Sequence, residues 1–309
     1  MQKRDYLSIL DLSIEETREV INLGFHYKME FKKGKFLENV LNNRTIALIF
    51  EKPSLRTIAT FQIAITQLGG YALNLEHQSV RMGQREPVKD VARNLDKWVN
   101  GIVSRVYSHQ TLIELAKYTT IPVINALSDL EHPCQALADT LTIFEITNFS
   151  KDFTLTFIGD GNNVSHSLML ISSYIGNRFI WAGPNGYEPN REIYNKSIEI
   201  SKKTGAKIEI TNDIVYAIKN SDFIYTDVWA SMGQESEAEE RKRIFREYQI
   251  NSEILKYAPK GYKIMHCLPA HRDEEITDEV IESENSIVFQ QAENRLHAQK
   301  GLIAFLYSK

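Results

Sequence analysis

Short apolar segments that alternate with longer amphipathic ones limit most strongly how this 309-residue chain can fold. Runs such as Thr45–Phe50 and Phe153–Ile158 have the length and the apolar character of buried strands. The segments between them carry apolar side chains at helical spacing. Strands that alternate with helices predict an α/β protein built on doubly wound parallel sheets.

The length of the chain favours two domains, because a domain usually holds about 150 residues. The strand–helix pattern restarts after the polar stretch Asn148–Asp152. We therefore predict a first domain over 1–148, a second over 149–290 and a terminal helix in 291–309. Within the second domain we expect a short strand at 286–289 and a solvated helix over the charged stretch 234–246.

Composition excludes several classes of protein. The 36 basic and 40 acidic residues give a net charge of −4, so no basic field favours a nucleic acid as partner. Two cysteines, Cys134 and Cys267, are too few for a disulfide scaffold or a Cys-based zinc finger. No apolar run approaches the roughly 20 residues of a membrane span, and the first residues lack a signal-peptide pattern. We expect a cytoplasmic protein that binds no membrane.

The segment Phe50–Thr57, FEKPSLRT, reads as the end of a strand, a turn and the start of a helix. The N–H groups at a helix start attract anions. Ser54 and Thr57 add hydroxyl donors, and Arg56 adds a planar cation suited to phosphate. An ordinary N-cap beside a surface arginine explains the same residues equally well.

The segment HPCQALAD, His132–Asp139, also reads as a helix start, with Pro133 at the first helical position. An imidazole near a helix N-terminus favours its neutral form and can donate one N–H to a carbonyl. The Gln135 side chain can both donate to and accept from an amide. A capping role for these residues remains the alternative, and Cys134 is interpreted as a packing residue.

Two further segments follow strands in the second half. The loop Gly159–Val164 lacks the third glycine of a dinucleotide fingerprint, and its Asn162 and Asn163 suit a polar small molecule better. Asp227 follows a strand, where open α/β sheets bind ligands. Its carboxylate would favour a ligand ammonium, or it would cap the next helix.

Cys267 also follows a strand and is a candidate nucleophile. It has no evident base, because His266 is expected to point to the opposite side of the strand. Taken alone, Cys267 is interpreted as a packing residue. His266 and His271 lack a matching pair of ligands, so the sequence predicts no metal. Arg295 opens the terminal helix and offers one more cation.

Seven segments in this order and spacing resemble the transcarbamoylase family over essentially the whole chain, and most closely its ornithine-using branch. They are FEKPSLRT (50–57), SRVYSH (104–109), HPCQALAD (132–139), GDGNNVSHS (159–167), DVWASMGQE (227–235), HCLPAHR (266–272) and AENRLHAQK (292–300). The resemblance implies transfer of a carbamoyl group from carbamoyl phosphate to the δ-amine of L-ornithine, which gives L-citrulline and phosphate without a cofactor. It also implies a homotrimer or a multiple of trimers, and a C-terminal helix that packs back on the N-terminal domain.

The resemblance also assigns roles to residues. Carbamoyl phosphate would be bound by Ser54, the Leu55 N–H, Arg56, Thr57, Arg81 of a neighbouring subunit, Arg105, His132, Gln135, Cys267, the Leu268 carbonyl and Arg295. Of these, the catalytic set would be Arg56, Arg105, His132, Cys267 and Arg295. Ornithine would be bound by Asn163 at its α-carboxylate, Asp227 at its α-ammonium, Ser231 and Met232. Cys267 would orient the δ-amine and help to deprotonate it, without forming a covalent intermediate.

Two positions depart from the family pattern. Ile58 stands where the family has arginine, and Arg81 stands where relatives have glutamine or histidine. Three alternatives therefore stay open: a transcarbamoylase for N-acylornithine or putrescine, a non-catalytic paralogue, and an NAD-dependent oxidoreductase that rests on Gly159–Gly161 alone. The sequence leaves open whether the chain acts in arginine synthesis or in arginine breakdown.

Overall fold

The structure, a computed structural model, describes residues 3–35, 39–76, 80–230 and 235–308. The chain divides into two compact units. Unit 1 comprises Met1–Leu141 with Glu293–Lys309, and unit 2 comprises Thr142–Ala292. The C-terminal helix therefore belongs largely to the first unit, as expected. Both crossings between the units fall inside helices, at 141/142 and 292/293.

Unit 1 is built on a parallel sheet of four strands in the order β2-β1-β3-β4. The strands are β1 (Thr45–Phe50), β2 (Tyr71–Glu76), β3 (Gly101–Arg105) and β4 (Val123–Leu127). The helices that begin in this unit are η1 (Ile9–Asp11), α1 (Ile14–Lys32), α2 (Leu55–Gln67), α4 (Val88–Trp98), α5 (His109–Lys117) and α6 (Pro133–Thr147). In the register, Phe50 pairs with Arg105, and Arg105 pairs with Leu127. The carboxyl ends of three strands therefore meet at one edge of the sheet.

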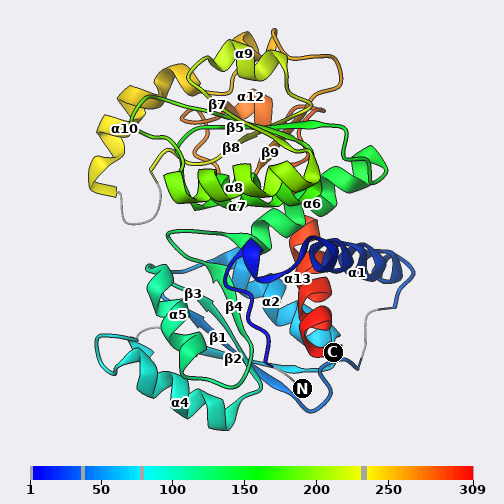
Figure 1. The fold of residues 1–309 in the computed structure, drawn as a ribbon, viewed down its shortest axis with the longest axis vertical. Helices are drawn as coiled ribbons and strands as arrows, with labels where there is room; N and C mark the ends of the chain where they lie inside the picture. Colours follow the sequence, from blue (N-terminus) through cyan, green and yellow to red (C-terminus); the bar gives the residue numbers. More distant parts are fainter. Residues whose placement is uncertain (1–2, 36–38, 77–79, 231–234, 309) are drawn as a thin grey trace. The chain divides into compact units, whose positions relative to one another are not determined.

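Helices cover both faces of this sheet (Figure 1), with α4 and α5 on one side and α2 on the other. Helix α4 buries Val88, Val91, Ala92 and Leu95, the spacing of a single helix face. These side chains share a core with β1, β3 and α5. Burial of this apolar face holds α4 on the sheet.

Helices α1 and α13 (Val288–Ser308) approach each other closely in unit 1. A Cβ atom added to Gly301 would lie 2.5 Å from the Val20 carbonyl oxygen and 2.6 Å from the Gly24 nitrogen. Only glycine permits this backbone contact. The pair of glycines therefore sets where the terminal helix lies along α1.

Unit 2 is built on a parallel sheet of five strands in the order β7-β6-β5-β8-β9. The strands are β5 (Thr154–Ile158), β6 (Arg178–Ala182), β7 (Lys207–Thr211), β8 (Phe223–Thr226) and β9 (Lys263–His266). The helices are α7 (Asn163–Ile175), α8 (Arg191–Thr204), α9 (Ile214–Lys219), η2 (Glu235–Glu237), α10 (Ala238–Phe245), η3 (Arg246–Tyr248), α11 (Ser252–Leu255) and α12 (Asp278–Ile281). Helices α7 and α8 cover one face of the sheet, and α9 and α12 cover the other (Figure 1).

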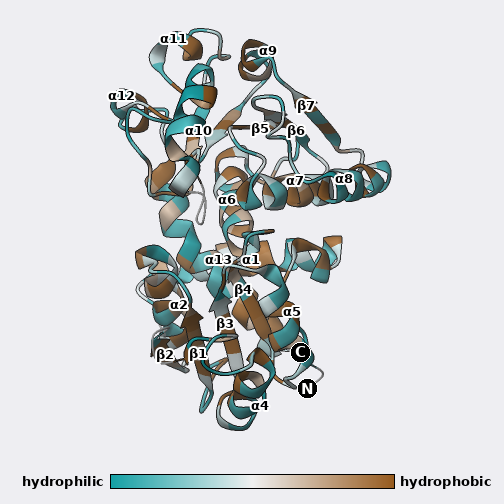
Figure 2. Ribbon diagram, turned by 90° about the vertical axis from the view of Figure 1, so that its left-hand side faces the viewer, coloured by the Kyte–Doolittle hydropathy of each residue, from teal (hydrophilic) through white to brown (hydrophobic). Residues whose placement is uncertain are grey.

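Hydropathy follows this layering. Figure 2 shows apolar residues in brown along the strands, with teal concentrated on helices and loops. Strands β1, β4 and β5 are buried along nearly their whole length, which is typical of parallel sheets covered on both faces. Within the described ranges, none of the helices has both the length and the apolar character to span a membrane.

Two local predictions were wrong. At 286–289 only Ser286 forms a bridge, to Ile264, and α13 already begins at Val288. A short apolar run does not distinguish a strand from a helix start. The charged stretch 234–246 is not fully solvated, since Arg241 and Phe245 of α10 are buried.

Candidate active site

The first group of predicted residues lies where the order of the unit 1 sheet reverses, between β1 and β3. Ligands of open α/β sheets bind at this kind of switch point, beyond the carboxyl ends of the strands. Ser54 follows β1 and Arg105 ends β3, and the Arg105 Nη1 donates to the Ser54 hydroxyl at 3.3 Å. The sheet topology thus brings together two residues that are 51 positions apart in the sequence.

Ser54 is the N-cap residue of α2, yet its side chain makes no capping hydrogen bond. Its hydroxyl instead accepts from Arg105. The first residue of the helix, Leu55, is 80% exposed, so the helix N-terminus faces solvent. These observations favour the anion-binding interpretation of the segment over simple capping.

Arg295 joins this group from the terminal helix. Its guanidinium donates from Nη1 to the Gln135 Oε1 at 2.5 Å and from Nη2 to the Thr57 Oγ1 at 3.1 Å. Arg295, Gln135 and Thr57 are all buried. Three elements, α2, α6 and α13, therefore converge on one guanidinium.

The Gln135 amide is oriented from its other end as well. Its Nε2 donates to the Asp139 Oδ1 at 2.8 Å, one helical turn further along α6. Because the amide nitrogen points to Asp139, the carbonyl oxygen of Gln135 faces Arg295. Sequence reasoning missed Asp139 as an orienting residue, although the i,i+4 spacing within HPCQALAD indicates such a contact.

His132 is 4% exposed, and its pKa is well below the usual 6.5. Burial is the largest cause, and the positive charges of Arg295 and Arg105 act in the same direction. The imidazole is therefore neutral near pH 7, as predicted. A neutral ring carries one N–H, which suits a carbonyl oxygen.

Cys134 is a packing residue, as predicted. It is 1% exposed, and its thiol donates to the Asn125 carbonyl oxygen at 3.3 Å. Burial raises the pKa of the thiol to about 12. A thiol that stays protonated at neutral pH is a poor nucleophile.

Within the part of the chain that the structure describes, two predicted residues of unit 1 make no side-chain hydrogen bond. Arg56, the second residue of α2, is partly buried. Arg81 is exposed between β2 and α4, with a left-handed φ of +42°, and its carbonyl accepts from the backbone N–H groups of Gln84 and Arg85. The roles given to Arg56 and Arg81 stay predictions.

The second group lies at the corresponding reversal in unit 2, between β5 and β8. Ile158 pairs with Thr226, and Thr226 pairs with His266, so the ends of β5, β8 and β9 align. The residues that follow these ends are the loop Gly159–Asn162, Asp227 and Cys267. The three segments singled out from the sequence therefore meet at one edge of this sheet.

Asp227 lies at the centre of this group. Its Oδ2 accepts from the Asn162 side-chain amide at 3.0 Å, and its Oδ1 accepts from the Cys267 thiol at 3.1 Å. Both carboxylate oxygens therefore face side chains of the candidate site. This arrangement favours ligand binding over helix capping as the role of Asp227, and it gives Cys267 a polar partner that packing alone does not explain.

Asn162 orients Asp227, a role that the sequence did not assign to it. As the N-cap of α7, its Oδ1 accepts from the backbone N–H groups of Val164 and Ser165. The amide nitrogen is thereby directed to Asp227. Asn163, to which the resemblance gives the ornithine carboxylate, is the partly buried first residue of α7. Ser231 and Met232 lie outside the described residues.

A buried arginine behind this group was also missed. The Arg241 Nη1 donates to the Asp160 carboxylate at 2.9 Å and to the Trp229 carbonyl at 3.0 Å. Burial raises the pKa of Asp160, while the neighbouring Arg241 opposes that shift. Arg241 therefore joins α10 to the glycine loop and to the segment after Asp227. Because the charged stretch was predicted to be solvated, a buried role for Arg241 was not expected.

The expectation that His266 points to the opposite side from Cys267 is wrong, since one of its ring nitrogens lies within 4.8 Å of the Cys267 sulfur. Its Nδ1 accepts from the Leu268 backbone N–H at 2.9 Å, so Nε2 carries the proton and donates to the Glu275 carboxylate at 3.0 Å. Both ring nitrogens are thus used. His266 and Glu275 hold the turn that carries Cys267 and Leu268, and the hydrogen bonds at both ring nitrogens argue against His266 as a base for the thiol.

Among the residues that the structure describes, two groups of side chains have ligand atoms close enough to hold a metal ion. These are Asp227, His266 and Cys267, and also His271, Glu274 and Glu275. In the first group a metal would have to displace a hydrogen bond of His266. In the second, the Lys242 ammonium already lies 2.9 Å from Glu274. The expectation that the protein uses no metal stays a prediction.

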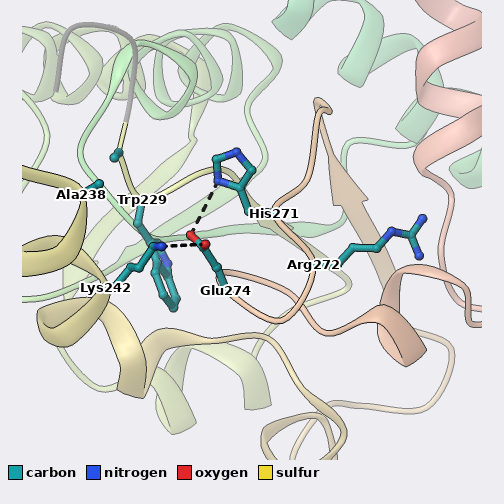
Figure 3. A pocket seen from close by; sticks show the side chains of 7 residues that line it. Trp229, Ala238, Lys242, His271, Arg272 and Glu274 are labelled. Atoms are coloured by element: carbon teal, nitrogen blue, oxygen red, sulfur yellow. Dashed lines mark ion pairs between the residues drawn. The ribbon is translucent and has the colours of Figure 1, made fainter. Parts of the chain in front are cut away.

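A pocket of about 360 Å³ opens in unit 2 close to this site. Figure 3 shows Lys242 and His271 turned toward Glu274, at 2.9 and 3.7 Å, while Arg272 points away. The pocket is lined by Trp229, Ala230, Ala238, Lys242, His271, Arg272 and Glu274. Trp229 and Ala230 connect Asp227 to the predicted ornithine residues Ser231 and Met232.

Comparisons with known proteins identify the family of the chain. The model of the carbamoyl-P binding domain of aspartate/ornithine carbamoyltransferases matches residues 4–145, and that of the Asp/Orn binding domain matches residues 151–306. The anabolic ornithine carbamoyltransferase of Pyrococcus furiosus is 47% identical over 98% of this chain and 96% of its own. The ornithine carbamoyltransferase of Archaeoglobus fulgidus is 48% identical over 98% and 97%.

The fold matches as well. The solved structure of ornithine carbamoyltransferase from Pyrococcus furiosus superposes with a TM-score of 0.96 at 46% identity, over 99% of this chain and 98% of that one. With two parallel α/β units that match carbamoyltransferase domains, the chain is an enzyme of the transferase class. It belongs to the aspartate/ornithine carbamoyltransferase family.

Proposed function

We propose that this chain is an ornithine carbamoyltransferase, which moves the carbamoyl group of carbamoyl phosphate to the δ-amine of L-ornithine. The products are L-citrulline and phosphate. The observation that carries the choice of amine is the Asp227 carboxylate between Asn162 and Cys267, because it offers a negative charge to an α-ammonium. The relatives from Pyrococcus furiosus and Archaeoglobus fulgidus are named ornithine carbamoyltransferases, and they match this chain over nearly its full length.

The unit 1 residues are assigned to carbamoyl phosphate. Arg56, Arg105, the hydroxyls of Ser54 and Thr57 and the Leu55 N–H would hold the phosphate, since guanidinium groups bind phosphate through paired hydrogen bonds. His132, Gln135 and Arg295 would bind the carbamoyl amide and carbonyl. Donors aimed at that oxygen stabilise the negative charge that develops on it during attack.

The unit 2 residues are assigned to ornithine. Asp227 would bind the α-ammonium and Asn163 the α-carboxylate, with Ser231 and Met232 completing the contacts. Cys267 and the Leu268 carbonyl would lie near the carbamoyl group and the δ-amine. The neutral amine nitrogen forms a bond to the carbonyl carbon, the bond to the phosphate oxygen breaks, and the nitrogen loses a proton.

The test is citrulline formation from carbamoyl phosphate with four amines side by side: L-ornithine, N-acetyl-L-ornithine, putrescine and L-aspartate. We expect turnover with L-ornithine alone. Turnover with another amine would overturn the role of Asp227 while leaving the carbamoyl phosphate residues in place. A folded protein without turnover would favour the non-catalytic alternative, and Ile58→Arg would be the first variant to restore the family pattern.

The assembly and the setting of the enzyme are part of the proposal. A homotrimer, or a multiple of trimers, would let Arg81 of one subunit serve the phosphate of the next. Mixing inactive Arg81→Ala and Arg56→Ala subunits should restore part of the activity, and sedimentation should show the trimer mass. No recovery from a verified trimer would exclude a shared site.

Free thiols at Cys134 and Cys267 support a cytoplasmic location, and the anabolic relative supports a role in arginine biosynthesis.

A further inference from the structure

We propose that Lys28 of α1 is a positioning residue that sets the direction of the Arg295 side chain. The inference rests on the proposed function, because it uses the role of Arg295 at the carbamoyl group. Lys28 Nζ donates to the Asn294 Oδ1 at 2.8 Å and lies 3.1 Å from the Glu293 Oε2. The two partners are the residues directly before Arg295 in the chain.

Lys28 is 1% exposed, which is rare for lysine. Removing an ammonium from water is costly unless charge and hydrogen bonds compensate. Glu293 supplies an opposite charge, and Asn294, itself fully buried, supplies an oxygen. The ammonium therefore binds both partners strongly and restrains the backbone that carries them.

Two restrained neighbours are enough to set the rotation of a helix about its axis. Successive residues of an α-helix project about 100° apart, so a helix whose positions 293 and 294 are held has a defined direction at 295. In that direction the Arg295 guanidinium reaches Gln135 and Thr57 together. A small rotation of α13 would break at least one of these bonds.

The glycine contact supplies the complementary restraint. Gly24 and Gly301 bring the backbones of α1 and α13 together and limit sliding of one helix along the other. Lys28 lies one turn beyond Gly24 on α1, and it binds α13 just where the chain returns to unit 1 at Glu293. The helix is therefore held at its entry into the unit, next to the residue that serves the site.

Lys300 provides a matched control within the same helix. It is also 1% exposed, and it lies over the Tyr27 ring at 4.8 Å and donates to the Gln67 Oε1 at 3.2 Å. Gln67 ends α2, the helix whose first turn carries the site. Removing either ammonium disturbs the packing of α13. Lys28 contacts Glu293 and Asn294 beside Arg295, whereas the contacts given above for Lys300 are to Tyr27 and Gln67.

The experiment compares Lys28→Met with Lys300→Met in the full-length enzyme. We expect both variants to lower the melting temperature. Lys28→Met should lower kcat/KM for carbamoyl phosphate about tenfold more than Lys300→Met does, while the KM for ornithine changes less than about twofold. Equal losses in the two variants would assign Lys28 to folding alone and overturn the proposal.

A double-mutant cycle separates positioning from general damage. In an Arg295→Ala background, measured at high enzyme concentration, Lys28→Met should cause little further loss of activity, because the group through which it acts is already gone. Additive losses would contradict the proposal. If Lys28→Met does not fold, Glu293→Gln repeats the cycle at a side chain that is 44% exposed, and the same coupling is expected with a smaller loss.

Failure of the inference differs from failure of the proposed function. If the function is wrong, the unmodified protein forms no citrulline from ornithine. If only the inference is wrong, the unmodified protein is active and the Lys28 and Lys300 variants behave alike.

Discussion

The two candidate sites occupy equivalent places in two parallel sheets, yet they present opposite charges. Each lies where the strand order reverses, at β1 and β3 in unit 1 and at β5 and β8 in unit 2. The first gathers Arg105 and Arg295 around a neutral His132. The second gathers Asn162 and Cys267 around Asp227. The shared topology places a site, and the side chains after the strands decide which ligand it suits.

In both sites, neutral groups orient a charged side chain. Arg295 donates to an amide oxygen and a hydroxyl, and Asp227 accepts from an amide and a thiol. Neutral partners orient a charged group without cancelling its charge. Close by, Asp160 is paired with Arg241 at 2.9 Å. The contrast favours a structural role for Asp160 and supports the proposed ligand-binding role of Asp227.

The largest effect should follow removal of a cation from the first site. Arg105→Ala should lower kcat/KM for carbamoyl phosphate about 100-fold or more, since one charged donor at a developing anion contributes on that order. Steady-state kinetics with each substrate varied in turn would measure it. Arg93→Ala, which removes an exposed arginine of the same unit, is the control and should change the rate less than twofold. A loss confined to the ornithine KM would contradict the charge assignment.

A substitution in the second site should change the KM for ornithine. Asp227→Asn should raise the ornithine KM about 10- to 100-fold, because a hydrogen bond to a charged group is lost, and should leave the KM for carbamoyl phosphate within about twofold. Asp213→Asn makes the same chemical change at the N-cap of α9, where asparagine also caps well. Equal changes in both KM values would mean that Asp227 holds the structure and not the amine.

The two cysteines allow a candidate site residue, Cys267, to be compared with a packing residue of the same type, Cys134. Cys267→Ala should lower kcat about tenfold by removing a polar neighbour of Asp227, with little effect on stability. Cys134→Ala should lower the free energy of unfolding by about 1 kcal/mol and leave both KM values unchanged. Denaturant unfolding and kinetics on both variants would test this, and the reverse pattern would exchange their roles.

The last effect concerns the pH dependence of stability. Burial and two arginines lower the pKa of His132 in the folded chain below its usual 6.5, so the unfolded chain binds a proton first as the pH falls. Stability should therefore fall as the pH drops below about 6.5. His132→Gln should reduce this slope by up to about 1.4 kcal/mol per pH unit. His109, whose pKa burial also lowers, should preserve part of the slope.

Urea unfolding between pH 5 and 8 would measure that slope. The exposed His26→Gln change is the control for loss of an imidazole. A His132→Gln curve parallel to that of the unmodified protein would contradict a neutral, buried His132.

Much of the fold could be predicted from local signals. The strand predicted at Thr45–Phe50 is β1 with the same limits, and α6 begins at Pro133 as predicted, because a short apolar run marks a strand and Pro133 marks a helix start. The error at 286–289 arose where Ile287 and Val288 form an apolar run too short to distinguish the two structures. The buried side of α10 was missed because charge patterns do not show that Arg241 has a buried partner.

By itself, the sequence determined the alternation of strands and helices and the residues that follow each strand end, because both depend on neighbours within a few positions. The family motifs, which are also short stretches of neighbouring residues, identified the side chains of the candidate site. Only the tertiary structure decided how they are oriented. Arg295 meets Gln135 and Thr57 across 160 and 238 residues, and Asn162 is directed to Asp227 by the cap of α7. Burial then lowers the pKa of His132, since desolvation depends on everything packed around a group.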